Sequence, residues 1–129
     1  MKIDAITNSF DGSIAIVDDE PDIVLVFIKV LQDNNYKVKG FTNPLLILEY
    51  LHQHPDEFDL IILDYRMSPM QGCELANEIA KINSRIKMVL LTAYNDIKNN
   101  ALNLEIIKKP ITLDEFLEIV ERYMKNESI

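Results

Sequence analysis

The sequence has few of the residues that mark specialised structural classes. Among its 129 residues there is one cysteine, Cys73, and no tryptophan. A lone cysteine cannot form an internal disulfide, so a disulfide framework is excluded. Three glycines and five prolines leave little room for long loops and exclude a collagen-like or low-complexity chain. The length and the 48% hydrophobic share instead predict one globular domain with a single core.

Long apolar runs and basic clusters are also missing. The longest apolar stretch, residues 23–31, is interrupted by Lys29 and is less than half of the roughly 20 residues that a membrane span needs. The formal charge is −8, and the only basic doublet is Lys108-Lys109, so a nucleic acid would be repelled. Because no secretory signal is recognisable, we expect a cytoplasmic protein without direct nucleic-acid or membrane binding.

Short β-branched segments alternate with longer amphipathic segments along the chain. This alternation predicts an α/β fold with a doubly wound, five-stranded parallel sheet covered on both faces, built from five strand–helix units. The predicted strands are residues 14–17, 36–41, 59–63, 86–91 and 104–107, and the clear helices are about 21–34, 44–54, 73–82 and 112–124. Thr112 and Glu115 have the spacing of a capping box at the start of the last helix.

The connection between the last two predicted strands is unusual. Residues 94–103 are polar and short for a crossover helix, so we expect a shortened or irregular fourth helix there. The domain is predicted to span residues 13–125, with an N-terminal extension at 1–12 and a C-terminal tail at 126–129.

Polar residues follow the predicted strands, where ligands bind in open α/β sheets. Asp18, Asp19 and Glu20 follow the first strand, Asp64 the third, Thr92 the fourth and Lys109 the fifth. Converging carboxylates repel one another unless a cation lies among them, and oxygen ligands favour Mg²⁺, with Mn²⁺ second. A threonine hydroxyl and a lysine ammonium suit phosphoryl oxygens, which makes Asp64 a candidate nucleophile toward phosphorus.

The motifs Asp18-Asp19, Asp64, Thr92-Ala93 and Lys109-Pro110, in this order, resemble the receiver domain of bacterial and archaeal two-component response regulators, in its single-domain, stand-alone form. The resemblance covers about residues 13–124 and implies a flavodoxin-like strand order 2-1-3-4-5. It further implies a phosphorelay signalling module that changes conformation on phosphorylation. Such a module is not an enzyme, because it promotes only its own phosphorylation and dephosphorylation.

The resemblance also implies a role for each site residue. Asp64 accepts a phosphoryl group from a sensor histidine kinase or a phosphotransfer protein. Asp19, Asp64 and the backbone carbonyl of Arg66 bind Mg²⁺ directly, and Asp18 binds it through water. Thr92 and Lys109 contact the phosphoryl oxygens. The downstream effector protein is not identified by the sequence.

Two positions and one spacing depart from the family pattern. Ser68 replaces the usual proline four residues after the acceptor, and Pro69 follows it. Ile106 occupies the switch position that usually holds tyrosine or phenylalanine, so rotation of an aromatic ring there cannot be the output. Thr92 and Lys109 are 17 positions apart, fewer than usual. The missing residues fall in the fourth helix and call the family's usual output and dimer face into question, which leaves homodimer formation open.

Two further pairs of residues are candidates for control of the reaction. Leu25 and Ile28 are predicted to face water beside the acidic crevice and to dock the phosphohistidine-bearing helices of a kinase. Arg66 and Tyr94 each lie two positions after a motif residue. They either shape the access of water to the acyl phosphate, and thereby its lifetime, or are ordinary surface residues.

Two other functions are compatible with a related fold. One is a receiver-like scaffold that works without phosphorylation, which the altered fourth helix would allow. The other is a phosphohydrolase with an aspartyl nucleophile, similar to haloacid dehalogenase-like enzymes. Those enzymes have Asp-x-Asp after the strand, whereas position 66 here is arginine, which argues against that function.

Overall fold

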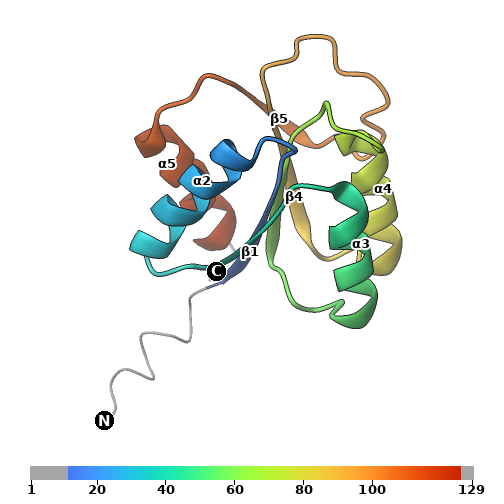
Figure 1. Cartoon of the computed structure of the whole chain (residues 1–129), viewed down its shortest axis with the longest axis horizontal. Coiled ribbons are helices and arrows are strands. Elements are labelled where there is room, and N and C mark those ends of the chain that lie inside the picture. The colour runs from blue at the N-terminus through green and yellow to red at the C-terminus, as the bar shows by residue number, and fades with distance from the viewer. Residues whose placement is uncertain (1–11, 126–129) are drawn as a thin grey trace.

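A five-stranded parallel sheet lies between two pairs of helices in the computed structural model, which describes residues 12–125 (Figure 1). The strands are β1 (Ser13–Val17), β2 (Lys37–Phe41), β3 (Leu60–Leu63), β4 (Lys87–Thr92) and β5 (Glu105–Lys108), and the helices are α2 (Pro21–Asp33), α3 (Pro44–Gln53), α4 (Gly72–Ile82) and α5 (Leu113–Lys125). The strand order is β2-β1-β3-β4-β5. The doubly wound fold and its flavodoxin-like order are therefore confirmed.

The two central strands separate the core into two layers. In β1, Ile14 and Ile16 pack with α2 and α5, whereas Ala15 and Val17 pack with α3 and α4. All four residues of β3 are buried. A strand without a polar side chain needs apolar cover on both faces, which the two helix pairs provide. Within residues 12–125 no helix is long and apolar enough to cross a membrane.

The parallel register brings the polar residues that follow the strands to one edge of the sheet. Val17 of β1 is in register with Leu63 of β3, so Asp18 and Asp64 come next to each other. Hydrogen bonding continues past the strands: the Asp64 N–H donates to the Val17 carbonyl at 3.0 Å. In the same way, the N–H of Lys109 donates to the carbonyl of Thr92 at 2.9 Å.

No helix connects β4 to β5. The expectation of a shortened helix at residues 94–103, and of five strand–helix units, is therefore wrong; the helix labelled α4 precedes β4. Residues 93–104 form a loop with one turn. Asn99 and Asn103 have φ angles of 65° and 57°, in the left-handed region, which asparagine tolerates better than most residues but which a continuous helix does not allow. The side chain of Asn100 bonds both the N–H and the carbonyl of Leu104, closing the turn.

Helix α2 departs from the sequence-based expectation at one of its two residues that were predicted to face water. Its buried residues are Val24, Phe27 and Leu31. The prediction that Ile28 faces water is wrong, because Ile28 is half-buried and packs with Val24 against the bare backbone of Gly40 on β2. Leu25 is 63% exposed, as predicted.

The ends of the domain follow the predicted pattern as far as the structure describes them. The Thr112 hydroxyl accepts from the Glu115 N–H, and the Glu115 carboxylate accepts from the Thr112 N–H, both at 3.0 Å, which confirms the capping box. The predicted extension and tail lie outside the described residues except for Gly12. This glycine is buried, and its carbonyl accepts from the N–H of Lys37.

Candidate functional site

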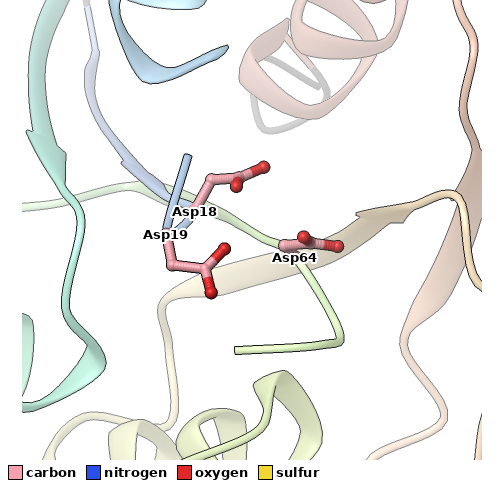
Figure 2. A group of neighbouring side chains, drawn as sticks. All are labelled: Asp18, Asp19 and Asp64. Carbon is pink, nitrogen blue, oxygen red and sulfur yellow. The ribbon is translucent and has the colours of Figure 1, made fainter. Parts of the chain in front are cut away.

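Three aspartates meet at the carboxyl ends of β1 and β3. Asp18, Asp19 and Asp64 each offer a carboxylate oxygen, and these oxygens lie within 4.8 Å of one another (Figure 2). Asp18 is buried, Asp64 is half-buried and Asp19 is exposed. Closely spaced oxygen donors with one exposed member fit a hard divalent cation such as Mg²⁺, which keeps water ligands on its open side.

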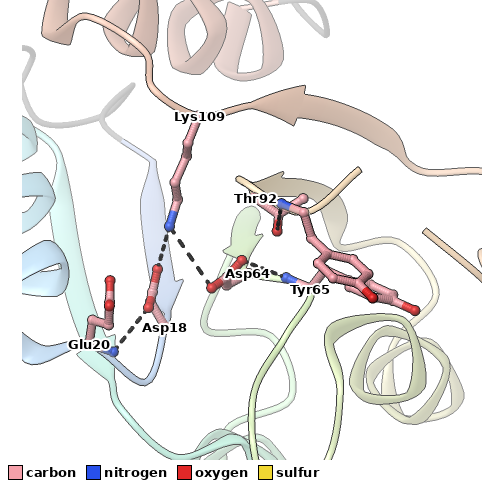
Figure 3. Close-up of polar contacts among 7 residues, drawn as sticks. Asp18, Glu20, Asp64, Tyr65, Thr92 and Lys109 are labelled. Atoms are coloured by element: carbon pink, nitrogen blue, oxygen red, sulfur yellow. Dashed lines mark hydrogen bonds and ion pairs between the residues drawn. The ribbon is translucent and has the colours of Figure 1, made fainter. Parts of the chain in front are cut away.

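Lys109 provides the positive charge beside this cluster. Its ammonium nitrogen lies 2.9 Å from Oδ2 of Asp18 and 3.9 Å from Oδ2 of Asp64 (Figure 3). The other oxygen of Asp18 accepts the N–H of Glu20 at 3.0 Å. Both oxygens of Asp18 are therefore engaged, whereas Asp64 is held less tightly by Lys109.

The environment of Asp64 disfavours its charged form. Burial is the main cause that raises the pKa of this carboxyl group, and the nearby carboxylate of Asp18 raises it further. Lys109, the Thr92 hydroxyl and the N–H of Tyr65 act in the opposite direction but do not cancel the increase in pKa. A cation or an uncharged substitute at this position should therefore stabilise the fold.

We expect Asp64→Asn to raise the free energy of unfolding at neutral pH in metal-free buffer by roughly 1 kcal/mol, the size of a typical favourable substitution. A raised pKa in the folded state means that ionisation opposes folding. The gain should thus be present above the folded-state pKa and disappear below the unfolded-state pKa, where both states are protonated.

Urea denaturation at about pH 7 and about pH 3, with EDTA present, measures this difference. The exposed Asp56→Asn is the control and should change little at either pH. A loss of stability for Asp64→Asn at neutral pH would contradict the electrostatic account.

Thr92 and two tyrosines form the other side of the site. Thr92, fully buried at the end of β4, accepts the N–H of Tyr94 at its hydroxyl oxygen, 3.1 Å away. The ring of Tyr94 stacks on that of Tyr65, with centroids 5.5 Å apart and planes inclined by 16°. The guanidinium of Arg66 lies 4.6 Å from the centroid of the Tyr94 ring. Arg66 and Tyr94, predicted separately from the sequence, therefore contact each other.

These groups surround an open cavity of about 340 Å³. It is lined by Asp19, Glu20, Ile23, Asp64, Arg66, Thr92, Ala93, Tyr94 and Lys109. A water molecule occupies about 30 Å³ in the liquid, so the cavity has room for a phosphoryl group, a cation and several waters. Its polar lining combines anionic oxygens on one side with a lysine and a threonine hydroxyl on the other.

Most of the site residues predicted from the sequence come together, and a few do not. The cavity or the aspartate cluster includes Asp18, Asp19, Asp64, Arg66, Thr92, Tyr94 and Lys109. Leu25, Ile28 and Ile106 do not line the cavity. Sequence reasoning missed Tyr65, which is only 4% exposed and whose N–H donates to Asp64 at 2.8 Å. An aromatic residue next to Asp64, two positions after the buried strand, is the only signal that could have indicated it.

The fold and this site define the receiver domain of response regulators. The family model described as the response regulator receiver domain matches residues 14–121, and the chain belongs to this family. Receiver domains of the family are signalling modules that are phosphorylated on an aspartate with Mg²⁺, by histidine kinases or phosphotransfer proteins.

Particular relatives agree with this assignment. The chain is 26% identical to sporulation initiation phosphotransferase F of Bacillus subtilis, over 89% of this chain and 95% of that protein. It is 31% identical to the transcriptional regulatory protein ZraR of Klebsiella oxytoca, but spans only 24% of that longer protein. The response regulator TrrA of Thermotoga maritima, solved in complex with Mg²⁺ and BeF, is 31% identical over 87% of this chain and 98% of that chain, with a TM-score of 0.77.

Proposed function

We propose that Asp64 is the phosphoacceptor of this receiver domain. The observation that supports this most strongly is its position: the Asp64 carboxylate lies beside those of Asp18 and Asp19, and the Lys109 ammonium reaches both Asp18 and Asp64. Asp18 already has both oxygens engaged, and Asp19 is exposed. Asp64 is therefore the carboxylate best placed to attack a phosphorus atom that enters the cavity.

The transfer reaction uses the chain's own groups in defined roles. An Asp64 carboxylate oxygen attacks the phosphorus of a phosphohistidine. The phosphorus–nitrogen bond then breaks, and its electron pair stays on the imidazole. Lys109 and the Thr92 hydroxyl donate hydrogen bonds to the phosphoryl oxygens. Asp19, Asp64 and the Arg66 carbonyl would hold Mg²⁺ directly, and Asp18 would hold it through water. When bound, the ion would neutralise charge on the carboxylate and phosphoryl oxygens, and Mn²⁺ would suit the same ligands.

The proposal is tested by the intact mass of the protein after incubation with acetyl phosphate. We expect a single phosphoryl adduct that requires Mg²⁺ and is absent in Asp64→Asn. An adduct that persists in Asp64→Asn would contradict the assignment of Asp64. No adduct in the wild type, with neither acetyl phosphate nor beryllofluoride bound, would favour the phosphorylation-independent scaffold. Continuous release of phosphate from unrelated phosphomonoesters would instead favour the phosphohydrolase and contradict the view that the chain acts only on its own phosphoryl group.

Arg66 and Tyr94 are proposed to set the lifetime of the acyl phosphate. The two residues contact each other and line the same cavity as Asp64, where this contact would limit the approach of water. Exposed contacts of this kind are worth roughly 0.5 to 1 kcal/mol, so we expect Tyr94→Ala to shorten the lifetime about twofold to fivefold. The decay of the adduct by mass measures this. Tyr50→Ala, on the far helix α3, is the control; an unchanged lifetime in Tyr94→Ala would indicate a plain surface role.

A docking surface for the phosphohistidine-bearing helices of a kinase is proposed on α2. Leu25 is exposed there. Ile28 is half-buried, so we assign the second docking position to Val26, which is 48% exposed. Val26 opens into an apolar groove of about 400 Å³ between α2 and the start of α5. The groove is lined by Asp22, Ile23, Val26, Phe27, Lys109, Pro110, Ile111 and Leu113. Because Lys109 belongs to both the groove and the site, a helix seated in the groove would deliver its phosphohistidine next to Asp64.

We expect Leu25→Asp to slow phosphotransfer from a histidine phosphotransfer protein at least about tenfold, since that corresponds to only about 1.4 kcal/mol of lost binding. Phosphorylation by acetyl phosphate should not change. Leu46→Asp on α3, which alters a similarly exposed leucine, is the matched control. Equal slowing with both donors would show that Leu25 acts on the site itself rather than on docking.

The output of the domain is proposed to pass to an effector protein. Residues 93–104 form a loop, so the expected helix between β4 and β5 is not there to contribute to a dimer surface. Arg122 of α5, a cation that could otherwise reach a second copy, is paired with both oxygens of Glu105 at 3.0 and 3.1 Å within one chain. These contacts favour a monomer over a homodimer formed through this face.

A further inference from the structure

The stacked tyrosines Tyr65 and Tyr94 are attached to the two groups that phosphorylation alters. The N–H of Tyr65 donates to Oδ1 of Asp64 at 2.8 Å, and the N–H of Tyr94 donates to the hydroxyl of Thr92 at 3.1 Å. If Asp64 becomes an acyl phosphate, its carboxyl group loses its negative charge and one of its oxygens becomes the bridging oxygen of a mixed anhydride. The Thr92 hydroxyl must then orient toward the phosphoryl oxygens. Both anchors of the tyrosine pair would therefore change together.

The same pair is connected to the loop at residues 93–104, which takes the place of the expected helix between β4 and β5. Tyr65 is 4% exposed, and its hydroxyl oxygen accepts the N–H of Lys98, in the middle of the loop, at 3.2 Å. The hydrogen bond joins residues 33 positions apart in sequence and ties the loop to the residue next to Asp64. A shift of the Tyr65 ring against Tyr94 would stretch or break it.

The alternative route through β5 lacks the necessary chemistry. Ile106 is 38% exposed and aliphatic, so it offers neither a hydroxyl nor a ring to couple to Thr92. Lys108, two residues further along β5, bonds the Ala93 carbonyl and the side chain of Asn95, which fixes only the first residues of the loop. The connection from the site to the middle of the loop therefore runs through Tyr65.

We propose that the Tyr65–Tyr94 pair transmits the phosphorylation state of Asp64 to residues 93–104, and that this loop is the surface an effector reads. The proposal rests on the proposed function, because it needs a phosphoryl group on Asp64. In the resting state the pair holds the loop through the Lys98 N–H. On phosphorylation, Thr92 and Tyr94 move relative to Tyr65, and the loop is released or held in a second arrangement that exposes different residues. The exposed apolar residues Leu102 in the loop and Ile106 in β5 belong to the surface that changes.

The test is amide hydrogen exchange of the full chain, with and without Mg²⁺ and beryllofluoride, in the wild type and in Tyr65→Phe. Phenylalanine keeps the ring and its stacking but removes the hydroxyl that accepts from Lys98. Tyr123→Phe is the matched control, because it also removes a hydroxyl that forms a hydrogen bond, here with Glu105, the first residue of β5, and not with Lys98 or a residue of the site. Fluorine NMR reports separately whether beryllofluoride is bound.

In the wild type we expect beryllofluoride to change exchange in residues 95–103 by about threefold to tenfold, as expected when a hydrogen bond is made or lost. In Tyr65→Phe the loop should exchange faster already in the resting state, and beryllofluoride should bind but no longer change loop exchange. The Tyr123→Phe control should behave as the wild type. An equal response of the loop in Tyr65→Phe, or a wild-type response confined to other segments, would overturn the proposal. Absence of bound beryllofluoride in the wild type would overturn the proposed function itself.

Discussion

Replacing Lys109 by methionine is expected to slow phosphorylation by acetyl phosphate roughly a hundredfold, the effect of removing one preorganised donor to a developing anion. The Lys109 ammonium lies 3.9 Å from Asp64 and is well placed to reach a phosphoryl oxygen on that residue. Methionine preserves much of the side-chain volume but carries no charge. The initial rate of adduct formation by intact mass, at saturating Mg²⁺, measures the loss.

Lys108→Met provides a neighbouring control. Lys108 lies one residue earlier, but its ammonium group bonds the carbonyl of Ala93 and the side chain of Asn95 rather than an aspartate of the site. We expect its rate of phosphorylation to stay within about twofold of the wild type, as for an exposed charge that contacts no carboxylate of the site. A similar loss in both variants would mean that general charge, not the position of Lys109, governs the reaction.

The second large effect is expected for Gly72→Ala, at the start of α4. A Cβ atom at position 72 would overlap with the backbone carbonyl oxygen of Asp64, which cannot move without moving the proposed phosphoacceptor. The Gly72 N–H also donates to the carbonyl of Tyr65 at 2.7 Å, so the two segments are held closely together. We expect a loss of about 1 to 3 kcal/mol in the free energy of unfolding, as for other overpacked sites, together with slower phosphorylation.

Gly12→Ala distinguishes a backbone clash from a side-chain clash. The added Cβ would overlap with the terminal methyl group of Met124, a flexible group that can adopt another rotamer. Urea denaturation should show a loss below about 1 kcal/mol for Gly12→Ala and no change in phosphorylation rate. If Gly12→Ala were as harmful as Gly72→Ala, the close approach to Asp64 would not be the reason for the effect at position 72.

The sequence predicts the elements of this fold closely because their signals are local. Each observed strand and helix begins and ends within one residue of its predicted bounds. Proline at the first helical position of α2 and α3, the capping box at Thr112, and the apolar run of β3 mark these boundaries directly. The site follows from the same information, since parallel strands bring the residues after their ends to one edge of the sheet.

Long-range packing explains what the sequence could not predict. The face of α2 that is buried depends on Gly40, whose missing side chain admits Val24 and Ile28. The loop at residues 93–104 was expected to be irregular, but only the left-handed residues Asn99 and Asn103 and the link from Lys98 to Tyr65 explain why no helix forms. No sequence motif indicated Tyr65, because its place in the site depends on ring stacking with Tyr94, which lies 29 residues later.

The assignment of Asp64 as the residue that carries the phosphoryl group is tested most directly by trapping that group where it forms. Borohydride reduces an aspartyl phosphate to homoserine, so peptide mass spectrometry after reaction with acetyl phosphate and Mg²⁺ identifies the modified residue. We predict homoserine at position 64 and at no other aspartate. Homoserine at Asp18 or Asp19, or a phosphoryl adduct that leaves residue 64 unreduced, would contradict the account.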